Sequence, residues 1–350
     1  MQKERHTGHV NYGSLLRLSV IIMFMIILVV GAKQSDATAV VGIRKATFSF
    51  CLWILFSLFF YNHSSIADVI VVGVILVWSG YESVVGLVQL INNTTYDYGG
   101  PTTFAGSFFN PGPFGGFLAC ALSVLIPTLL NPNTKNYSVV IQYKFFLLVV
   151  IVLSVLLLSF SNSRAAVLSL LCSTFFFAYE TTRGRRFLNQ MAIPICVIVL
   201  LMCTWGYLAK KRSADGRLFM GKICMHAMIE NKLWGAGLGH FGEAYEKSQY
   251  DYFAKEISIK NGELSTGSSK KEDRQKACEP FWAFNMVFLV GIEMGFMSVA
   301  VFINVVILTL IILYQQCRLL FYGFMTITIF GLFSYSIMII TYLLNYDKMI

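Results

Sequence analysis

The stretch KFFLLVVIVLSVLLLSFSNSRAAVLSLLCSTFFFAYE, residues 144–180, decides the fold. It contains two apolar runs, 144–160 and 164–180, joined by the polar residues Ser161 to Arg164. At about 1.5 Å per helical residue, each run is long enough to cross most of a hydrocarbon layer about 30 Å thick. The pattern predicts two membrane helices that meet at a short polar turn containing an arginine.

The whole chain of 350 residues has the composition of a membrane protein. Hydrophobic residues make up 56% of it and charged residues 13%, against roughly 25% charged residues in soluble domains. The segment 209–280 carries 13 of the 27 basic and 10 of the 18 acidic side chains. We therefore predict an all-α polytopic membrane protein with three parts: N-terminal transmembrane helices (1–208), a large polar loop (209–280) and C-terminal transmembrane helices (281–350).

Apolar runs of membrane length recur along the chain and predict about nine to ten transmembrane helices. The run at 284–314 is too long for one straight span, so we expect a tilted or broken helix there. The predicted helices cover residues 14–32, 46–62, 66–90, 113–130, 144–160, 164–180, 190–208, 284–314 and 319–342.

The distribution of Lys and Arg over the short loops predicts the orientation. With the N-terminus inside, most basic loops are cytoplasmic, and the outer loop 91–112 has no Lys or Arg. The loop 33–45 breaks this rule with three basic residues. On balance the polar loop 209–280 lies outside the cytoplasm, and Arg164 lies on the same face.

Two helices and a glycine-rich turn are expected within the polar loop. Residues 216–230 have apolar side chains at helical spacing, so this helix could lie on the membrane surface with Met and Phe dipping into the interface. An aromatic-rich stretch, 245–253, predicts a second helix, and 258–277 reads as flexible and solvated. The alternating glycines between the helices, which predict a turn, are Gly235, Gly237 and Gly239.

Two arginines are candidate ligands for phosphate. Arg164 stands at a membrane boundary, where it could simply extend to lipid headgroups or could hold a diphosphate with its planar guanidinium. Arg217, in the pair Gly216-Arg217, is weaker evidence because exposed arginines are ordinary. A basic outer segment suits anionic headgroups or a lipid-linked phosphate, and no basic stripe of the kind that binds nucleic acid is present.

Glu293 is a sharper candidate because it stands among apolar residues, which disfavour the ionised carboxylate. It could instead be a protonated or hydrogen-bonded structural residue near a helix break. His240 is more typical of a surface histidine. The glycines at 235–239 do not have the spacing of a dinucleotide fingerprint. No cluster of Cys and His has the spacing of a metal site.

Several short elements occur in a fixed order: G-x-x-x-N-P at Gly106 to Pro111, Ser163-Arg164, Gly216-Arg217, G-x-G-x-G-x-F at Gly235 to Phe241, and Phe284-Asn285 with Glu293 and Gly295. Together they resemble the O-antigen ligase and O-antigen polymerase family of bacterial membrane glycosyltransferases. The resemblance covers residues from about 100 to 300.

The resemblance implies a GT-C-like helical bundle in the bacterial inner membrane, with a large periplasmic loop over the active site. It also implies transfer of a glycan from an undecaprenyl-diphosphate-linked donor to a glycan, lipid A core or protein acceptor, without metal or cofactor. Arg164 and Arg217 would then bind the leaving diphosphate, with Asn285 and Glu293 beside them in catalysis. The residues implied in substrate binding are Asn110, Gly235, Gly237, Gly239 and His240.

One position departs from the family pattern. The ligases carry a catalytic histidine before the asparagine, and here that position is Phe284. Glu293, Glu279 or His240 could supply the base instead, or the reaction could need little help from one. The alternative function is a transporter or flippase for a lipid-linked or anionic solute, although no internal repeat typical of transporters is present.

Overall fold

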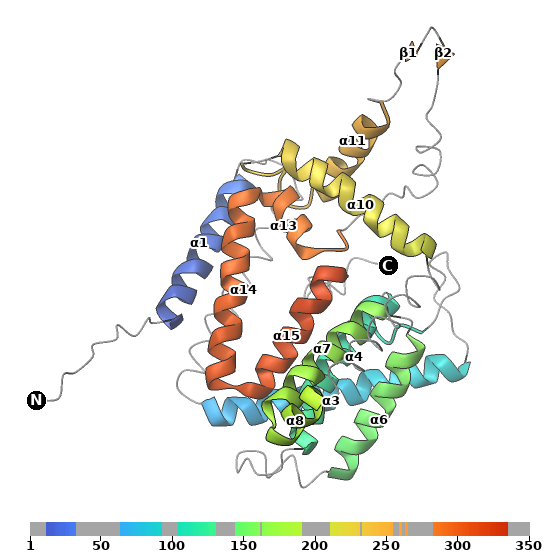
Figure 1. Ribbon diagram of the computed structural model, residues 1–350, viewed down its shortest axis with the longest axis vertical. Coiled ribbons are helices and arrows are strands. Elements are labelled where there is room, and N and C mark those ends of the chain that lie inside the picture. Colours follow the sequence, from blue (N-terminus) through green and yellow to red (C-terminus); the bar gives the residue numbers. More distant parts are fainter. Residues whose placement is uncertain are drawn as a thin grey trace, which may run out of the picture.

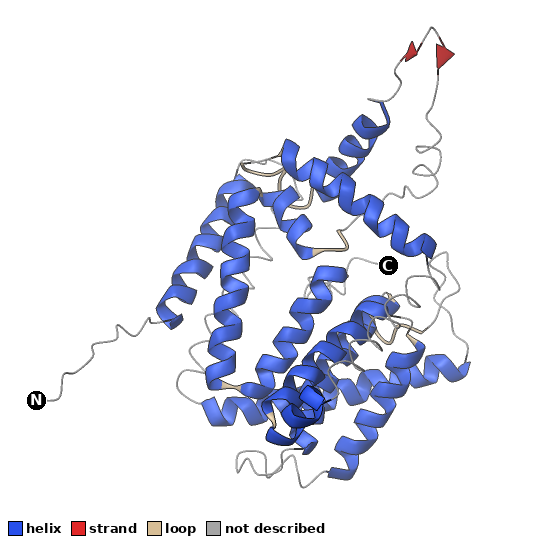
Figure 2. Ribbon diagram, viewed as in Figure 1, coloured by secondary structure: helices blue, strands red, loops and turns tan. Residues whose placement is uncertain are grey.

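The computed structural model describes residues 12–32, 64–92, 104–108, 110–130, 144–161, 163–190, 211–231, 233–254, 259–260, 263–264 and 283–334. In these residues the protein is helical apart from one pair of two-residue antiparallel strands (Figure 2). The elements are α1 (Tyr12–Ala32), α3 (Ser64–Asn92), α4 (Pro111–Leu130), α6 (Lys144–Phe160), α7 (Arg164–Glu180), α8 (Thr182–Gln190), α10 (Lys211–Glu230), α11 (Phe241–Ala254), β1 (Ile259–Lys260), β2 (Glu263–Leu264), α13 (Met286–Met294), α14 (Phe296–Gln316) and α15 (Arg318–Phe333).

Four of these helices are long and apolar enough to cross a membrane: α1, α3, α4 and α14. The helices α6 and α15 are apolar but shorter. The membrane helices predicted at 144–160 and 164–180 are present as helices, α6 and α7, with the same bounds, but neither is among the four candidate membrane spans. The predicted helices 46–62 and 190–208, and the part of 319–342 beyond residue 334, lie outside the described residues.

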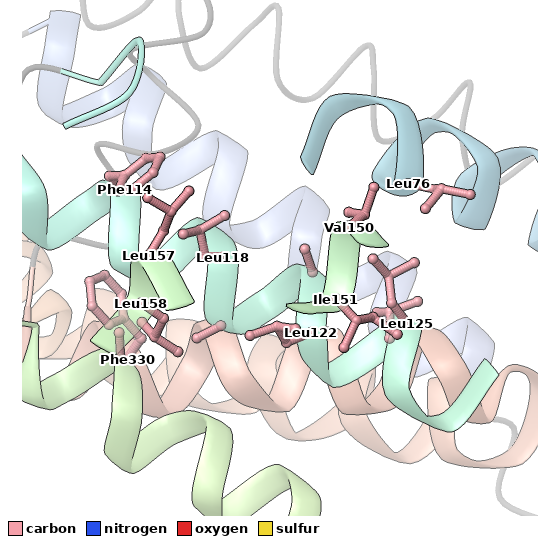
Figure 3. Close-up of a cluster of buried hydrophobic side chains, with 14 of the residues drawn as sticks. Leu76, Phe114, Leu118, Leu122, Leu125, Val150, Ile151, Leu157, Leu158 and Phe330 are labelled. Carbon is pink, nitrogen blue, oxygen red and sulfur yellow. The ribbon is translucent and has the colours of Figure 1, made fainter. Parts of the chain in front are cut away.

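The main apolar core surrounds α4, which packs against α3, α6, α7 and α15. Figure 3 shows side chains from α4, α6 and α15 meeting there, with Leu76 of α3 at one side. Gly116 lets α4 and α15 approach closely, because a Cβ at this position would stand 2.6 Å from the ring of Phe330. Van der Waals packing of these apolar side chains holds the bundle together.

The contacts between α4, α7 and α15 show which ends of these helices lie together. Gly116 near the start of α4 faces Phe330 near the end of α15, so these helices are antiparallel. At the other end, Glu180 of α7 accepts hydrogen bonds from Arg318 and Tyr322 at the start of α15. The starts of α4 and α7 and the end of α15 therefore share one end of the bundle, which we call the site end.

A second unit, made of α10, α11 and α13, lies at the site end (Figure 1). Its core includes Phe219, Ile223, Phe241, Tyr245 and Ile292. The helices predicted at 216–230 and 245–253 are confirmed, but they start earlier, at Lys211 and Phe241. The helix α13, which falls within the predicted C-terminal transmembrane part, packs against both of them.

A tilted or a broken helix was expected in the run 284–314, and the structure shows a break at Gly295, between α13 and α14. Gly295 has φ +82°, a conformation that favours glycine. A Cβ there would also overlap the carbonyl oxygen of Leu233. The break therefore serves the contact between the membrane helix α14 and the turn that follows α10.

Candidate functional site

The C-terminal end of α15 is the meeting point of residues from distant parts of the chain. Arg217 of α10 donates from Nη1 to the carbonyl oxygen of Phe333 at 3.3 Å. Asn285 donates from Nδ2 to the carbonyl oxygen of Leu332 at 3.0 Å. The last carbonyls of a helix have no partner within the helix and carry its negative dipole end, so a cation and an amide suit this position.

Asn285 is held from two sides. Its Oδ1 accepts a hydrogen bond from the amide of Val287 at 2.7 Å, so Asn285 caps the start of α13. Its Nδ2 donates to the carbonyl oxygen of Leu332 at the end of α15, as described above. A single side chain thus links the start of α13 to the end of α15.

Arg217 also contacts the residue at the position of the family's histidine. Its Cζ lies 5.0 Å from the centroid of the Phe284 ring, which is a cation–π distance. The arginine side chain is nevertheless exposed. Phe284 therefore supports the guanidinium of Arg217 and offers no proton-transfer group.

Asn110 lies next to the end of α15 as well. Its Oδ1 accepts from the amide of Gly112 at 2.8 Å at the start of α4. A Cβ at Gly112 would lie 3.2 Å from this Oδ1 and 3.7 Å from Oγ of Ser334, the residue that follows α15. The G-x-x-x-N-P element therefore borders the carbonyls bound by Arg217 and Asn285.

Ser163, which precedes Arg164, packs against the same part of α4. Its Oγ is 3.5 Å from the carbonyl oxygen of Gly112, and a Cβ at Gly115 would stand 2.7 Å from the Cβ of Ser163. Arg164 begins α7 and is half-buried. The structure thus brings Asn110, Arg164, Arg217 and Asn285 to one end of the bundle, which we call the helix-end site.

The remaining predicted residues form a separate group at the glycine turn. Ala236 and Gly237 donate from their amides to the carbonyl oxygens of Ile292 and Glu293, at 2.7 and 3.0 Å. The backbone has positive φ angles of 74°, 118° and 80° at its three glycines, Gly235, Gly237 and Gly239. The G-x-G-x-G-x-F element therefore packs against the E-x-G element, Glu293 to Gly295, through these backbone hydrogen bonds.

The carboxyl group of Glu293 lies inside this turn, before the span that begins at Phe296. Burial raises its pKa from 4.5 to about 7, although hydrogen bonds from the amides of Gly239 and Phe241 and the nearby His240 partly lower it. Its Oε1 is buried without a hydrogen-bond partner among the residues that the structure describes. Glu293 therefore stabilises the turn and is suited to carry a proton near neutral pH.

Glu293 belongs to the glycine turn and does not reach the helix-end site. Asn285 and Glu293 stand at opposite ends of α13, about 12 Å apart along the helix at 1.5 Å per residue. His240 belongs to the glycine turn, where its Nδ1 lies 3.1 Å from the carbonyl oxygen of Leu238. Glu279, the third candidate base, lies outside the described residues.

Two residues of α3 that the sequence analysis passed over support the site. Glu82 is fully buried and accepts hydrogen bonds from the amide of Ser107 at 3.0 Å and from its hydroxyl. Gln89 accepts from the amides of Ala105 and Gly106, at 3.0 and 2.9 Å, and donates to the carbonyl oxygen of Gly106 at 2.7 Å. These side chains hold the loop that leads to Asn110. In the sequence, Glu82 could have been noticed as a carboxylate inside an apolar run.

Within the described part of the chain, no three His, Cys, Asp or Glu side chains gather as a metal site requires. Comparisons with protein families, with curated proteins and with solved structures find no match to this chain.

Proposed function

We propose that this protein transfers a glycan from an undecaprenyl-diphosphate carrier to an acceptor hydroxyl at the outer face of the bacterial inner membrane. The observation that carries the proposal is the convergence at the helix-end site. Asn110, Arg164, Arg217 and Asn285 come from four separate elements of the family pattern and lie at one end of one bundle. The site includes the start of α4, a helix long and apolar enough to cross a membrane, and a lipid-linked diphosphate would be presented at such a helix end.

The charges at the opposite end of the bundle support this orientation. Basic residues stand at the start of α6, in α8 and at the start of α15, and these are Lys144, Arg185, Arg186 and Arg318. Lys and Arg gather on the cytoplasmic side of membrane proteins. The site end would then face the periplasm, where α10 and α11 form part of the large loop.

In the proposed reaction, the acceptor oxygen bonds to the anomeric carbon of the donor glycan. The bond from that carbon to the phosphate oxygen breaks, and its electron pair stays on the departing diphosphate. Arg164 and Arg217 would neutralise this charge, which is the largest source of stabilisation available to such a site. The acceptor hydroxyl loses its proton to a base, for which Glu293, His240 and Glu279 remain candidates.

The acceptor would be a lipid A core, another glycan repeat unit or a protein hydroxyl. The test expresses the wild-type chain, Arg164→Ala and Arg217→Ala in a strain lacking its own copy, and separates the surface polysaccharide on a gel. We expect a glycan ladder from the wild type and its loss in both variants, since removal of one charge-stabilising group costs about 100-fold or more in rate. Membrane levels of each variant are measured by immunoblot.

Arg185 offers a matched control. Like Arg217, it donates to a helix-end carbonyl at 3.3 Å, that of Tyr179, and its Cζ lies 5.0 Å from an aromatic ring. It stands at the opposite end of the bundle, so Arg185→Ala should keep the ladder. Wild-type ladders from Arg164→Ala and Arg217→Ala would refute the roles assigned to them. Movement of a lipid-linked solute across the membrane of reconstituted vesicles, without glycan transfer, would instead identify a transporter or flippase.

A further inference from the structure

The helix α10 presents an apolar face to its surroundings. Leu218, Met225 and Ile229 are spaced by seven and four residues, which places them on one side of a helix. All three are exposed, Leu218 to 69%. We call these residues, together with the exposed Leu233 and Trp234 that follow the helix, the apolar stripe.

The apolar stripe is not needed to pack α10 within the protein. The opposite side of the helix carries a separate apolar set, including Phe219, Ile223 and Met228, which is buried against α11 and α13. The Phe and two of the three Met residues of this helix, Met220 and Met228, are therefore core residues. The side chains left for an outside partner are those of the stripe.

The position of α10 indicates what that partner is. Near its start, Arg217 is hydrogen-bonded to Phe333 at the end of α15. Just beyond its end, the carbonyl of Leu233 packs against Gly295, the residue before α14. From Arg217 to its end at Glu230, the helix thus runs for about 20 Å, at 1.5 Å per residue, between the ends of two apolar helices. It lies at the level where membrane helices begin and end.

Exposed apolar residues also begin the neighbouring helix α14, which is long and apolar enough to cross a membrane. Phe296 and Met297, the first residues of α14, are exposed and follow directly on Gly295. The span that they begin, 296–316, is among the most apolar helices of the protein. An exposed tryptophan and phenylalanine at this level are typical of residues at a membrane–water interface.

Two lysines share the exposed side of α10. Lys211 and Lys222 are seven residues before and four residues after Leu218, and both are exposed. Nζ of Lys222 lies 2.8 Å from the hydroxyl of Tyr252 in α11, which marks the side of the stripe toward α11. Both lysines thus lie on the same side of the helix as the stripe, and long lysine side chains on an apolar face extend their ammonium groups to anionic headgroups.

We propose that α10 is an interfacial helix, with the apolar stripe embedded among the lipid acyl chains just below the headgroups and its lysines at the headgroup level. The partner is the bilayer surface itself. The proposal does not depend on glycan transfer, and its test measures no activity. In the folded protein the stripe would hold Arg217 and Asn285 at a constant depth in the membrane.

The test uses single spin labels at Leu218→Cys, Ile229→Cys and Tyr250→Cys in a chain whose native cysteines are replaced by alanine, reconstituted in vesicles of anionic and zwitterionic lipid. Tyr250 is the matched control, because it is an exposed aromatic residue of α11, at 74%. We expect labels at 218 and 229 to collide more often with oxygen, which partitions into lipid, than with a water-soluble nickel chelate. The label at 250 should show the reverse.

A second measurement uses the native chain and does not require the substitutions to fold. Vesicles containing a lipid with a photoreactive group in its acyl chain are irradiated, and adducts are located by mass spectrometry. Adducts within 218–234 and none within α11 would support the proposal. Preferential nickel access at 218 and 229 would overturn it, as would labels that neither reagent reaches, which would show that protein covers the stripe.

Discussion

Arg217 and Phe333 are joined by a hydrogen bond across 116 positions of the sequence, from the guanidinium to a carbonyl oxygen at the end of α15. The neighbouring carbonyl of Leu332 is bound by Asn285. The unit formed by α10, α11 and α13 is thereby tied to the membrane bundle at the point where the family pattern predicts chemistry. Substitutions in this region change stability as well as any activity, and the two effects can be separated.

Asn285→Ala should destabilise the protein more than Asn285→Ser. Alanine removes the donor to Leu332 and the cap of α13, which cost about 1 kcal/mol each. Serine keeps an oxygen for the cap and loses only the donor. Thermal unfolding in detergent should therefore give the order wild type, Asn285→Ser, Asn285→Ala. Equal losses in both variants would show that the cap contributes nothing.

Gly235→Ala should be strongly destabilising. Gly235 has φ +74°, and a Cβ there would overlap the carbonyl oxygen of Glu293. The expected loss exceeds about 1 kcal/mol because strain and backbone displacement add to each other. Gly242 is the matched control: it lies in α11 with open space around a Cβ, so Gly242→Ala should leave stability unchanged or raise it slightly. The reverse order in thermal unfolding would contradict the description of the turn.

Glu82→Ala should destabilise the loop that leads to Asn110. Ser107 is exposed, so its amide and hydroxyl would lose an acceptor that water can partly replace, at a net cost of about 0.5–1.5 kcal/mol for each hydrogen bond. Glu82→Gln keeps one acceptor oxygen and should cost less. Glu243→Ala, at a side chain 80% exposed, is the control and should change the melting temperature little. A Glu82→Ala protein as stable as this control would show that the loop is held by other contacts.

The Glu293 carboxyl should make stability depend on pH. Its pKa is 4.5 when unperturbed and about 7 in the folded protein, so between these values the folded chain binds more protons than the unfolded chain. The free energy of unfolding should therefore fall as the pH rises from 4.5 to about 7, by roughly 3 kcal/mol at most, and then level off. Melting temperatures across this range should slope less in Glu293→Gln. An identical slope in both proteins would assign the effect to another group.

The helices were the part of the structure that could best be predicted from the sequence. The bounds of α6 and α7 were predicted because the change from apolar to polar residues marks the places where a chain leaves the hydrocarbon. A tilt or a break in the run 284–314 was predicted from length alone, without its position at Gly295. The cause of the break, the close approach of Leu233, involves a segment more than 60 residues away and leaves no local signal.

The partners of the candidate site residues could not be predicted in the same way. Arg217 and Asn285 bind backbone carbonyls of α15, and every residue has a carbonyl, so no side-chain pattern marks the acceptor. The division of the candidates between the helix-end site and the glycine turn has a similar origin. It follows from backbone hydrogen bonds of Ala236 and Gly237 to α13, which depend on the fold.

The place of α15 in the chain has a consequence for biogenesis. The carbonyls of Leu332 and Phe333 are synthesised after every residue that binds them or borders them in the helix-end site. A nascent chain that has been made as far as α13 therefore carries Asn110, Arg164, Arg217 and Asn285 before the carbonyls of α15 exist. Arg217 and Asn285 can bind these carbonyls only after α15 has been made, so this part of the fold assembles late in the synthesis of the chain.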